Sequence, residues 1–243
     1  MSDAEVMSTA LVGALYLHGH LERACVIMKL CRYIPTMLSV SRFTRRLHRL
    51  QEHFIALFCL ICTIAKRSHA PIYLLDSFPI PVCENSRINR CRIYRGREYR
   101  GYVASKNQYF FGVKLQVMAT RDGLPVEMFL TPGSVPDNRA IQHFSFDLPE
   151  GSVVYADAGY THYPTEDLLA EAAHISLIPQ RARNSRRPWP PEVTAAVQHH
   201  RKRIETVGSM ITGLFPKRIH AVTPQGFELK VFLFVLAYSI YVL

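Results

Sequence analysis

The stretch Ile72-Tyr73-Leu74-Leu75-Asp76 places a short apolar run directly before an aspartate, and Ser152-Val153-Val154-Tyr155-Ala156-Asp157 repeats the arrangement. A compact apolar run of this length is typical of a buried strand. Ligands of open α/β sheets bind beyond the carboxyl ends of the strands, so two aspartates in such positions are candidates for one polar site. The alternative is that each aspartate simply forms a turn.

The residues between these two runs predict further strands. Val113, Leu115 and Val117 alternate with polar residues, which is typical of a half-exposed strand. Asp122-Gly123 predicts a hairpin turn that leads into an antiparallel strand from Leu124 to Thr131. We therefore expect three neighbouring strands before the second apolar run.

Helices are expected between and after the later strands. Asp137 is placed to cap a helix through Phe144, and Pro164 opens a second helix. Ile175 to Ile178 predicts a fifth strand, and Ile204 and Val207 belong to the apolar face of a long helix after it. This order predicts an α/β fold, a hairpin-containing mixed sheet flanked by helices.

The predicted secondary structure of the chain changes at Pro71. Residues 1–70 lack strand alternation and predict a helical region, whereas residues 71–243 carry the strands and predict an α/β domain. Near the end, Val231 to Leu243 is apolar but shorter than the roughly 18 residues that span a bilayer. We therefore expect a buried C-terminal helix and no membrane partner.

The formal net charge is +10, with 29 Lys and Arg against 19 Asp and Glu. Such an excess favours a polyanionic partner, and clustered arginines favour nucleic acid over an anionic membrane surface. Solvated charged surfaces are the alternative for each cluster. The residues predicted to contact DNA are Arg42, Arg45 and Arg46, then Arg87, Arg90, Arg92, Arg95 and Arg97, then Arg181, Arg183, Arg186 and Arg187, with Trp189 and Arg201.

Two of these clusters have specific structural expectations. Ser41 to Leu50 predicts an amphipathic helix with a basic exterior, which is either the second helix of a helix-turn-helix or an ordinary packing layer. Trp189 either stacks on a distorted base or pins its loop to the core. Cys59 and Cys62 form a lone pair without a second pair at ligand spacing, which argues against zinc and favours reduced cysteines in the cytoplasm.

Five short motifs together resemble one family. Asp76-Ser-Phe-Pro-Ile-Pro-Val-Cys83 and Ala156-Asp157-Ala158-Gly159-Tyr160 resemble the two aspartate motifs of DDE transposases from bacterial insertion sequences. Phe110 to Leu115 and Leu130 to Val135 resemble that family's second and third strands, and Arg201 to Thr206 the helix that carries its glutamate. The motifs follow the family's order along nearly the whole chain.

The resemblance implies that residues 71–243 form a catalytic domain of ribonuclease H-like fold, in which Asp76, Asp157 and Glu205 bind two Mg²⁺ ions and Mn²⁺ can substitute. A carboxylate triad on rigid elements suits such ions. Arg201 fits the family, but Gln198 and Thr212 stand where relatives often carry Tyr and Lys. For Glu205, a solvated ion pair with Arg201 is the alternative. Asp122 and Asp137 are rival acids with turn and cap explanations.

The implied function is transposition, with DNA cleavage at the element's ends followed by strand transfer. The implied partners are double-stranded DNA, as terminal inverted repeats and target, and a second copy in a DNA-bound homodimer. The expected location is the bacterial cytoplasm, at the nucleoid. The alternatives are a nuclease of the same fold and a truncated relic that only binds DNA, since Met1 falls inside the family's N-terminal helical region.

Overall fold

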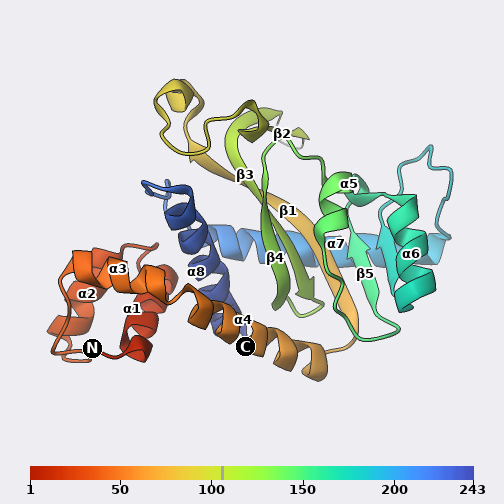
Figure 1. Ribbon diagram of the computed structural model, residues 1–243. Helices are drawn as coiled ribbons and strands as arrows, with labels where there is room; N and C mark the ends of the chain where they lie inside the picture. Colours follow the sequence, from red (N-terminus) through yellow and green to blue (C-terminus); the bar gives the residue numbers. More distant parts are fainter. Residues whose placement is uncertain (105–106) are drawn as a thin grey trace. The chain divides into compact units, whose positions relative to one another are not determined.

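A computed structural model describes residues 1–104 and 107–243, which divide into two compact units (Figure 1). The helical unit comprises Met1–Ile61 with Ser209–Leu243, and the sheet unit comprises Cys62–Gly208. This division differs from the expected boundary at residue 70, because the end of the chain packs with the N-terminal helices. Each unit is described below by itself.

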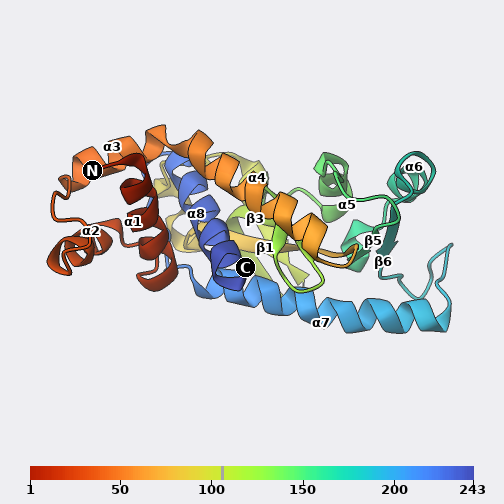
Figure 2. The same ribbon diagram turned by 90° about the horizontal axis from the view of Figure 1, so that it is seen from below.

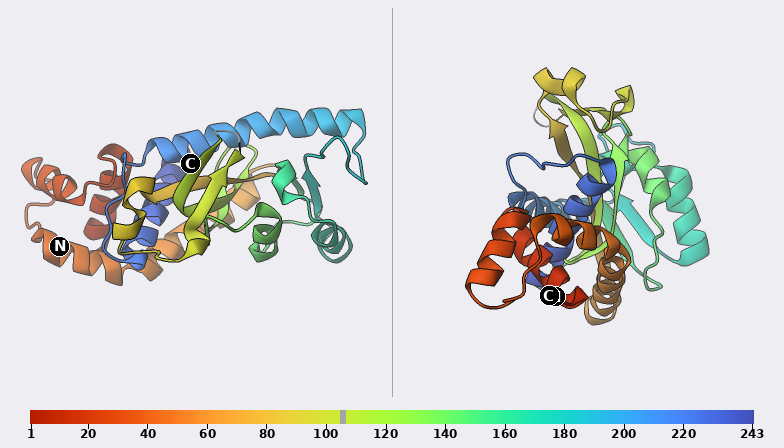
Figure 3. Two further views of the ribbon diagram at one scale, coloured as in Figure 1. Left: turned by 90° about the horizontal axis from the view of Figure 1, so that it is seen from above. Right: turned by 60° about the vertical axis from the view of Figure 1, so that its left-hand side comes forward.

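The helical unit is held together by small and aromatic side chains. Ser2 and Glu5 form a capping box at the start of α1, in which each side chain bonds the other residue's backbone N–H. Ala10 of α1 and Phe234 of α8 are fully or almost fully buried, and α8 lies beside α1 in each view (Figures 1 and 3). Its helices are α1 (Asp3–Tyr16), α2 (Leu21–Leu30), α3 (Val40–Arg49), the first part of α4 (Gln51–Ser68) and α8 (Pro224–Val242).

The last helix is longer than the apolar run that predicted it. By length and composition, α8 is sufficient to cross a bilayer, as is the bent pair formed by α3 and α4. However, 56% of the most apolar window of α8 is buried inside the protein, and its buried residues run from Phe227 to Ser239. The predicted buried C-terminal helix is confirmed, because this apolar surface forms the core of the helical unit.

The sheet unit contains a mixed sheet in the order β2-β3-β1-β5-β6, and β4 pairs with β3 as well. β1 is antiparallel to β3 and parallel to β5, and β5 is parallel to β6. The predicted mixed sheet is thus confirmed, with β2 as an additional strand. Its strands are β1 (Ile72–Cys83), β2 (Arg100–Val103), β3 (Gln108–Thr120), β4 (Pro125–Pro132), β5 (Val153–Ala156) and β6 (Ser176–Pro179).

Helices cover both faces of this sheet. α7 runs along one face, and α5 and α6 lie on the other (Figures 1 and 2). His200 of α7 stacks on Tyr155 of β5 with ring centroids 4.5 Å apart. The helices are α5 (Asp137–Ala140), α6 (Tyr163–Ala173) and α7 (Pro191–Gly213), with 3-10 turns η1 (Asn85–Arg90), η2 (Arg97–Tyr99), η4 (Ile141–His143) and η5 (Ala158–Tyr160).

Two strands differ from their predictions. β1 does not end before Asp76 but continues to Cys83, although it contains Pro79 and Pro81. Its pairing with β5 stops at Leu75, so that edge of β1 is open beyond this residue, where prolines are tolerated. β3 was predicted to be half exposed, yet its polar residue Gln116 is fully buried, because both faces of the strand are covered.

The close approach of α7 to β1 can be tested by unfolding. A Cβ added at Gly208 would overlap the ring of Phe78, whereas a Cβ at Gly213 of the same helix would meet open space. Alanine favours a helix over glycine by about 1 kcal/mol, but overpacking costs typically 1–3 kcal/mol. In urea titrations we expect Gly208→Ala to lower the free energy of unfolding and Gly213→Ala to keep or raise it. Equal effects at both positions would contradict this packing.

Candidate active site

Asp76 and Asp157 directly follow the last paired residues of two neighbouring parallel strands. The parallel pairing of β1 with β5 ends at Leu75 and Ala156, and the two aspartates are the next residue on each strand. β5 ends there and turns into η5, whereas β1 continues. The two carboxylates predicted to share a site are therefore brought together by the register of the sheet.

The electrostatics of Asp76 reflect this crowding. Burial, together with the nearby carboxylates of Asp157 and Asp137, raises the pKa of its carboxyl from the usual 3.8 to about 7. The backbone N–H of Ser77 donates to Asp76 Oδ1 at 2.7 Å and, with the charge of Arg201, partly offsets the shift. The site therefore concentrates negative charge that a cation would relieve.

Glu205 lies on α7 and is bound to Arg201. The Arg201 guanidinium donates from Nε to Glu205 Oε1 at 3.0 Å, and its Nη1 lies 3.4 Å from Asp157 Oδ1. Nη1 also donates to Gln180 Oε1 at 2.7 Å. The ion pair considered as the alternative for Glu205 is thus present, and it places a positive group between two of the predicted metal ligands.

The residues fit a divalent cation through their donor chemistry. Asp76 and Asp157 supply two adjacent carboxylates, and Mg²⁺ commonly binds one or two carboxylates, waters and the substrate's phosphates. In the part of the chain that the structure describes, no group of three His, Cys, Asp or Glu side chains is arranged to hold one ion. Glu205 would join the pair only after it leaves Arg201.

Asp137 belongs to this site, which corrects its expected role as a helix cap. The N-cap of α5 is Pro136, and Asp137 makes no capping hydrogen bond. Its Oδ1 accepts instead from Lys114 Nζ at 2.7 Å, Ser77 Oγ at 3.1 Å and Gln116 Nε2 at 3.4 Å. Ser77 directly follows Asp76, so Asp137 supports the strand that carries the first aspartate.

A buried hydrogen-bonded chain positions Gln116 against Asp137. The hydroxyl of Tyr160, the last residue of the second aspartate motif, donates to Gln116 Oε1, and Gln116 Nε2 also donates to Thr131 Oγ1. A Cβ on Gly159 would stand 3.2 Å from Asp137 Oδ2, so glycine leaves room for this carboxylate. Polar residues in a strand covered on both faces are the signal that could have identified this network.

The arginines between Arg87 and Arg100 lie where DNA could reach them. All of them are exposed, and Arg87 pairs with Glu84. Five line an open hollow of about 520 Å³ on the η1 and η2 segment, namely Arg90, Arg92, Arg95, Arg97 and Arg100. We call this the arginine hollow.

The cluster before α7 is partly structural. The Arg181 and Glu166 side chains, only 6% and 7% exposed, form a bidentate ion pair. The guanidinium of Arg181 also stacks on Trp189, whose Nε1 donates to Pro179 O at 2.8 Å. This geometry does not support the predicted DNA contact of Arg181 and favours the pinning role for Trp189. Arg187 pairs with Asp167, and Arg183 and Arg186 are exposed.

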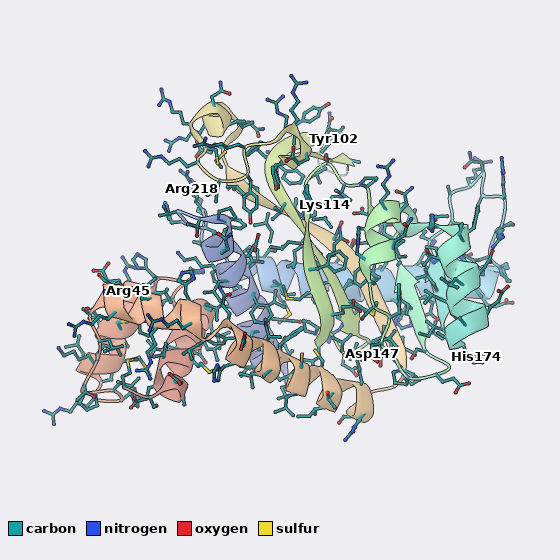
Figure 4. All side chains as sticks on the ribbon, in the orientation of Figure 1. Arg45, Tyr102, Lys114, Asp147, His174 and Arg218 are labelled. Carbon is teal, nitrogen blue, oxygen red and sulfur yellow. The ribbon has the colours of Figure 1, made fainter. Side chains whose placement is uncertain are left out.

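In the helical unit, the predicted basic helix is α3. Phe43 and Leu47 are buried, while Arg42 and Arg45 are exposed (Figure 4 labels Arg45). Arg46 is less available, because it binds Asp3 at 2.7 Å. Residues 31–39 join α2 to α3, a connection longer than the turn of about three or four residues in a helix-turn-helix.

Comparisons with known proteins agree with this arrangement. Residues 67–240 match the profile of a family described as the transposase DDE domain. No curated protein matches the chain. A cryo-EM structure of a piggyBac transposase synaptic complex with hairpin DNA is similar, with a TM-score of 0.53 and 12% identity over 98% of this chain. The chain spans 65% of the length of that protein. This likeness shows a shared fold, and the mixed sheet flanked by helices is consistent with the predicted ribonuclease H-like fold.

The raised pKa of Asp76 gives a test in the presence of a chelator. Its folded-state pKa of about 7 lies above the unfolded value near 3.8, so the folded state holds a proton that the unfolded state releases. Wild-type stability should therefore fall, relative to that of Asp76→Asn, as the pH rises from about 4 to about 7. Denaturant titrations at several pH values measure this difference. A difference that does not change with pH would contradict the burial of this carboxyl.

The ion pair of Asp137 with Lys114 gives a second test. Asp137→Ala leaves the part-buried ammonium without its carboxylate, and we expect a loss of about 2–3 kcal/mol in the free energy of unfolding. Lys114→Met should cost less, because the carboxylate keeps Ser77 and Gln116 as donors. The double variant should lose less than the sum of the two single variants. Additive losses in this cycle would show that the pair is not coupled.

Proposed function

Because the chain belongs to the transposase DDE domain family, we propose that it cuts DNA at the ends of a mobile element and joins those ends to target DNA. The observation that carries the proposal is the pair of carboxylates, Asp76 and Asp157, at the end of the parallel β1–β5 pairing. A third carboxylate, that of Glu205, is linked to Asp157 by Arg201, whose guanidinium pairs with both.

DDE transposases generally use divalent metal ions. We propose two Mg²⁺ ions, replaceable by Mn²⁺, with Asp76, Asp157 and Glu205 as ligands. When bound, the ions would stabilise the negative charge that develops on the phosphate during cleavage. The raised pKa of Asp76 supports this assignment, because burial and the neighbouring carboxylates both make its negative charge unfavourable and a bound cation would offset that cost.

The chain's own residues would prepare the site for these ions. The Ser77 N–H fixes one oxygen of Asp76, and the Ser77 hydroxyl ties the same strand to Asp137. Arg201 would have to release Glu205 for the triad to close. The freed guanidinium would then be available to a DNA phosphate, as predicted from the sequence.

Double-stranded DNA is the proposed substrate, as terminal repeats and as target. The arginine hollow supports this, because five exposed arginines would bind phosphates without reading the base sequence. Arg42 and Arg45 of α3 and Arg183 and Arg186 before α7 are further candidates. Homodimer formation on DNA and a location at the bacterial nucleoid belong to the same proposal.

The proposal is tested with Asp157→Asn, which keeps the shape of the side chain and removes its charge. Purified protein is incubated with DNA that carries candidate element ends, with Mg²⁺ or with a chelator, and cleavage and binding are measured separately. We expect Asp157→Asn to lose cleavage by at least about 10²-fold while DNA binding is nearly retained. The control is Asp147→Asn, an exposed aspartate that pairs with Lys66 and should leave cleavage unchanged. Full cleavage by Asp157→Asn would remove this residue from the site.

Strand transfer distinguishes a transposase from a nuclease of the same fold. Pre-cut ends with free 3′-hydroxyls are supplied with target DNA and Mg²⁺, and joined products are measured. A transposase forms them, whereas a nuclease only shortens the DNA. Binding without either reaction would instead support the DNA-binding relic.

A further inference from the structure

An aromatic groove lies between the arginine hollow and the active site. It has a volume of about 710 Å³ and is bordered by β2, β3 and the segment that leads into α5. Its aromatic lining consists of Tyr102, Tyr109 and Phe110, and Arg100 and Lys114 also line it. Figure 4 labels Tyr102 and Lys114 on this part of the sheet.

The two tyrosines present open ring surface to this groove. Tyr102 and Tyr109 are cross-strand partners, with ring centroids 4.8 Å apart and planes inclined by 48°. Such a pair stabilises a hairpin, yet the residues remain 49% and 70% exposed. The Tyr102 hydroxyl donates to Asn107 Oδ1 at 2.7 Å, which holds its ring in place. The pair is therefore an aromatic surface that is open to solvent.

The charges around the groove favour a polyanion. Arg100 and Ile88 line both the groove and the arginine hollow, so the two depressions adjoin. Neither depression has an Asp or Glu among the described residues that line it. Lys114, which lines the other end of the groove, binds Asp137, and the negative charge of Asp137 disfavours ionisation of Asp76. A strand whose phosphates follow the arginines would thus pass the tyrosines on its way to the site.

We propose that this groove binds an unpaired nucleobase of the DNA strand, stacked on Tyr102 or Tyr109 with its phosphate on Arg100. The inference rests on the proposed function and adds a substrate feature to it. Every base has a flat π-face, so stacking on tyrosine tolerates any sequence. In paired DNA those faces are covered by neighbouring bases. The groove therefore selects DNA with unpaired nucleotides beside the cut, and not continuous duplex.

The test compares two DNA ligands in a chelator, so that binding is measured without cleavage. One is a blunt duplex and the other is the same duplex with a short single-stranded overhang. We expect the wild-type chain to bind the overhang DNA at least about fivefold more tightly, as stacking of one base implies. Tyr102→Ala with Tyr109→Ala should lose this preference, and the Phe replacements should keep it. Tyr16→Ala is the matched control, because this tyrosine of α1 is also 70% exposed.

Cross-linking the wild-type chain locates the base directly. 5-Iodouracil in the overhang is irradiated in the complex, and the attached residue is identified by mass spectrometry. A cross-link to Tyr102 or Tyr109 supports the proposal, and one to Trp189 or to the helical unit overturns it. Equal binding of both DNAs by the wild-type chain would overturn the inference alone. Failure to bind either DNA would overturn the proposed function as well.

Discussion

The candidate active site depends on the point at which β1 and β5 cease to pair. Up to Leu75 and Ala156 the two strands share a parallel ladder, and beyond it β5 turns away while β1 continues beside β3. Adjacent parallel strands lie about 4.8 Å apart, so residues that follow the last pair are unavoidably neighbours. Backbone hydrogen bonds along the ladder thus hold together two carboxylates that repel each other.

The surroundings limit the cost of that repulsion. The Ser77 N–H and Arg201 favour the ionised form of Asp76, against burial and two neighbouring carboxylates. Asp137 has its own donors in Lys114, Ser77 and Gln116. Lys114 and Gln116 of β3 therefore support the site, and their burial is explained by the Asp137 carboxylate that they bind.

The sequence was sufficient to predict the strands that carry the aspartates, because short apolar runs are a local signal. It was insufficient for Asp137, since an aspartate at the start of a helix has the pattern of a cap whether or not its side chain makes that bond. Burial of Gln116 likewise depends on Tyr160 and Thr131, which are distant in sequence. Local patterns therefore located the strands, whereas the network around them depends on tertiary packing.

The positions of the arginines in the sequence likewise did not show which of them are available to DNA. Arg181 is held by Glu166 and Trp189, whereas Arg183 is exposed only two residues later. Composition counts both as positive charge, although only an exposed guanidinium can release counterions from DNA.

Arg201 acts as an internal counter-ion, and this has a thermodynamic consequence. In the proposed site, its contacts with Asp157 and Glu205 would be broken before both carboxylates could serve a metal, so metal binding would exchange one cation for another. A DNA phosphate that accepted the displaced guanidinium would lower the cost of this exchange. By linkage, DNA would then tighten metal binding by the same factor by which metal tightens DNA binding. The free chain would hold its ions weakly, and the complete site would assemble on its substrate.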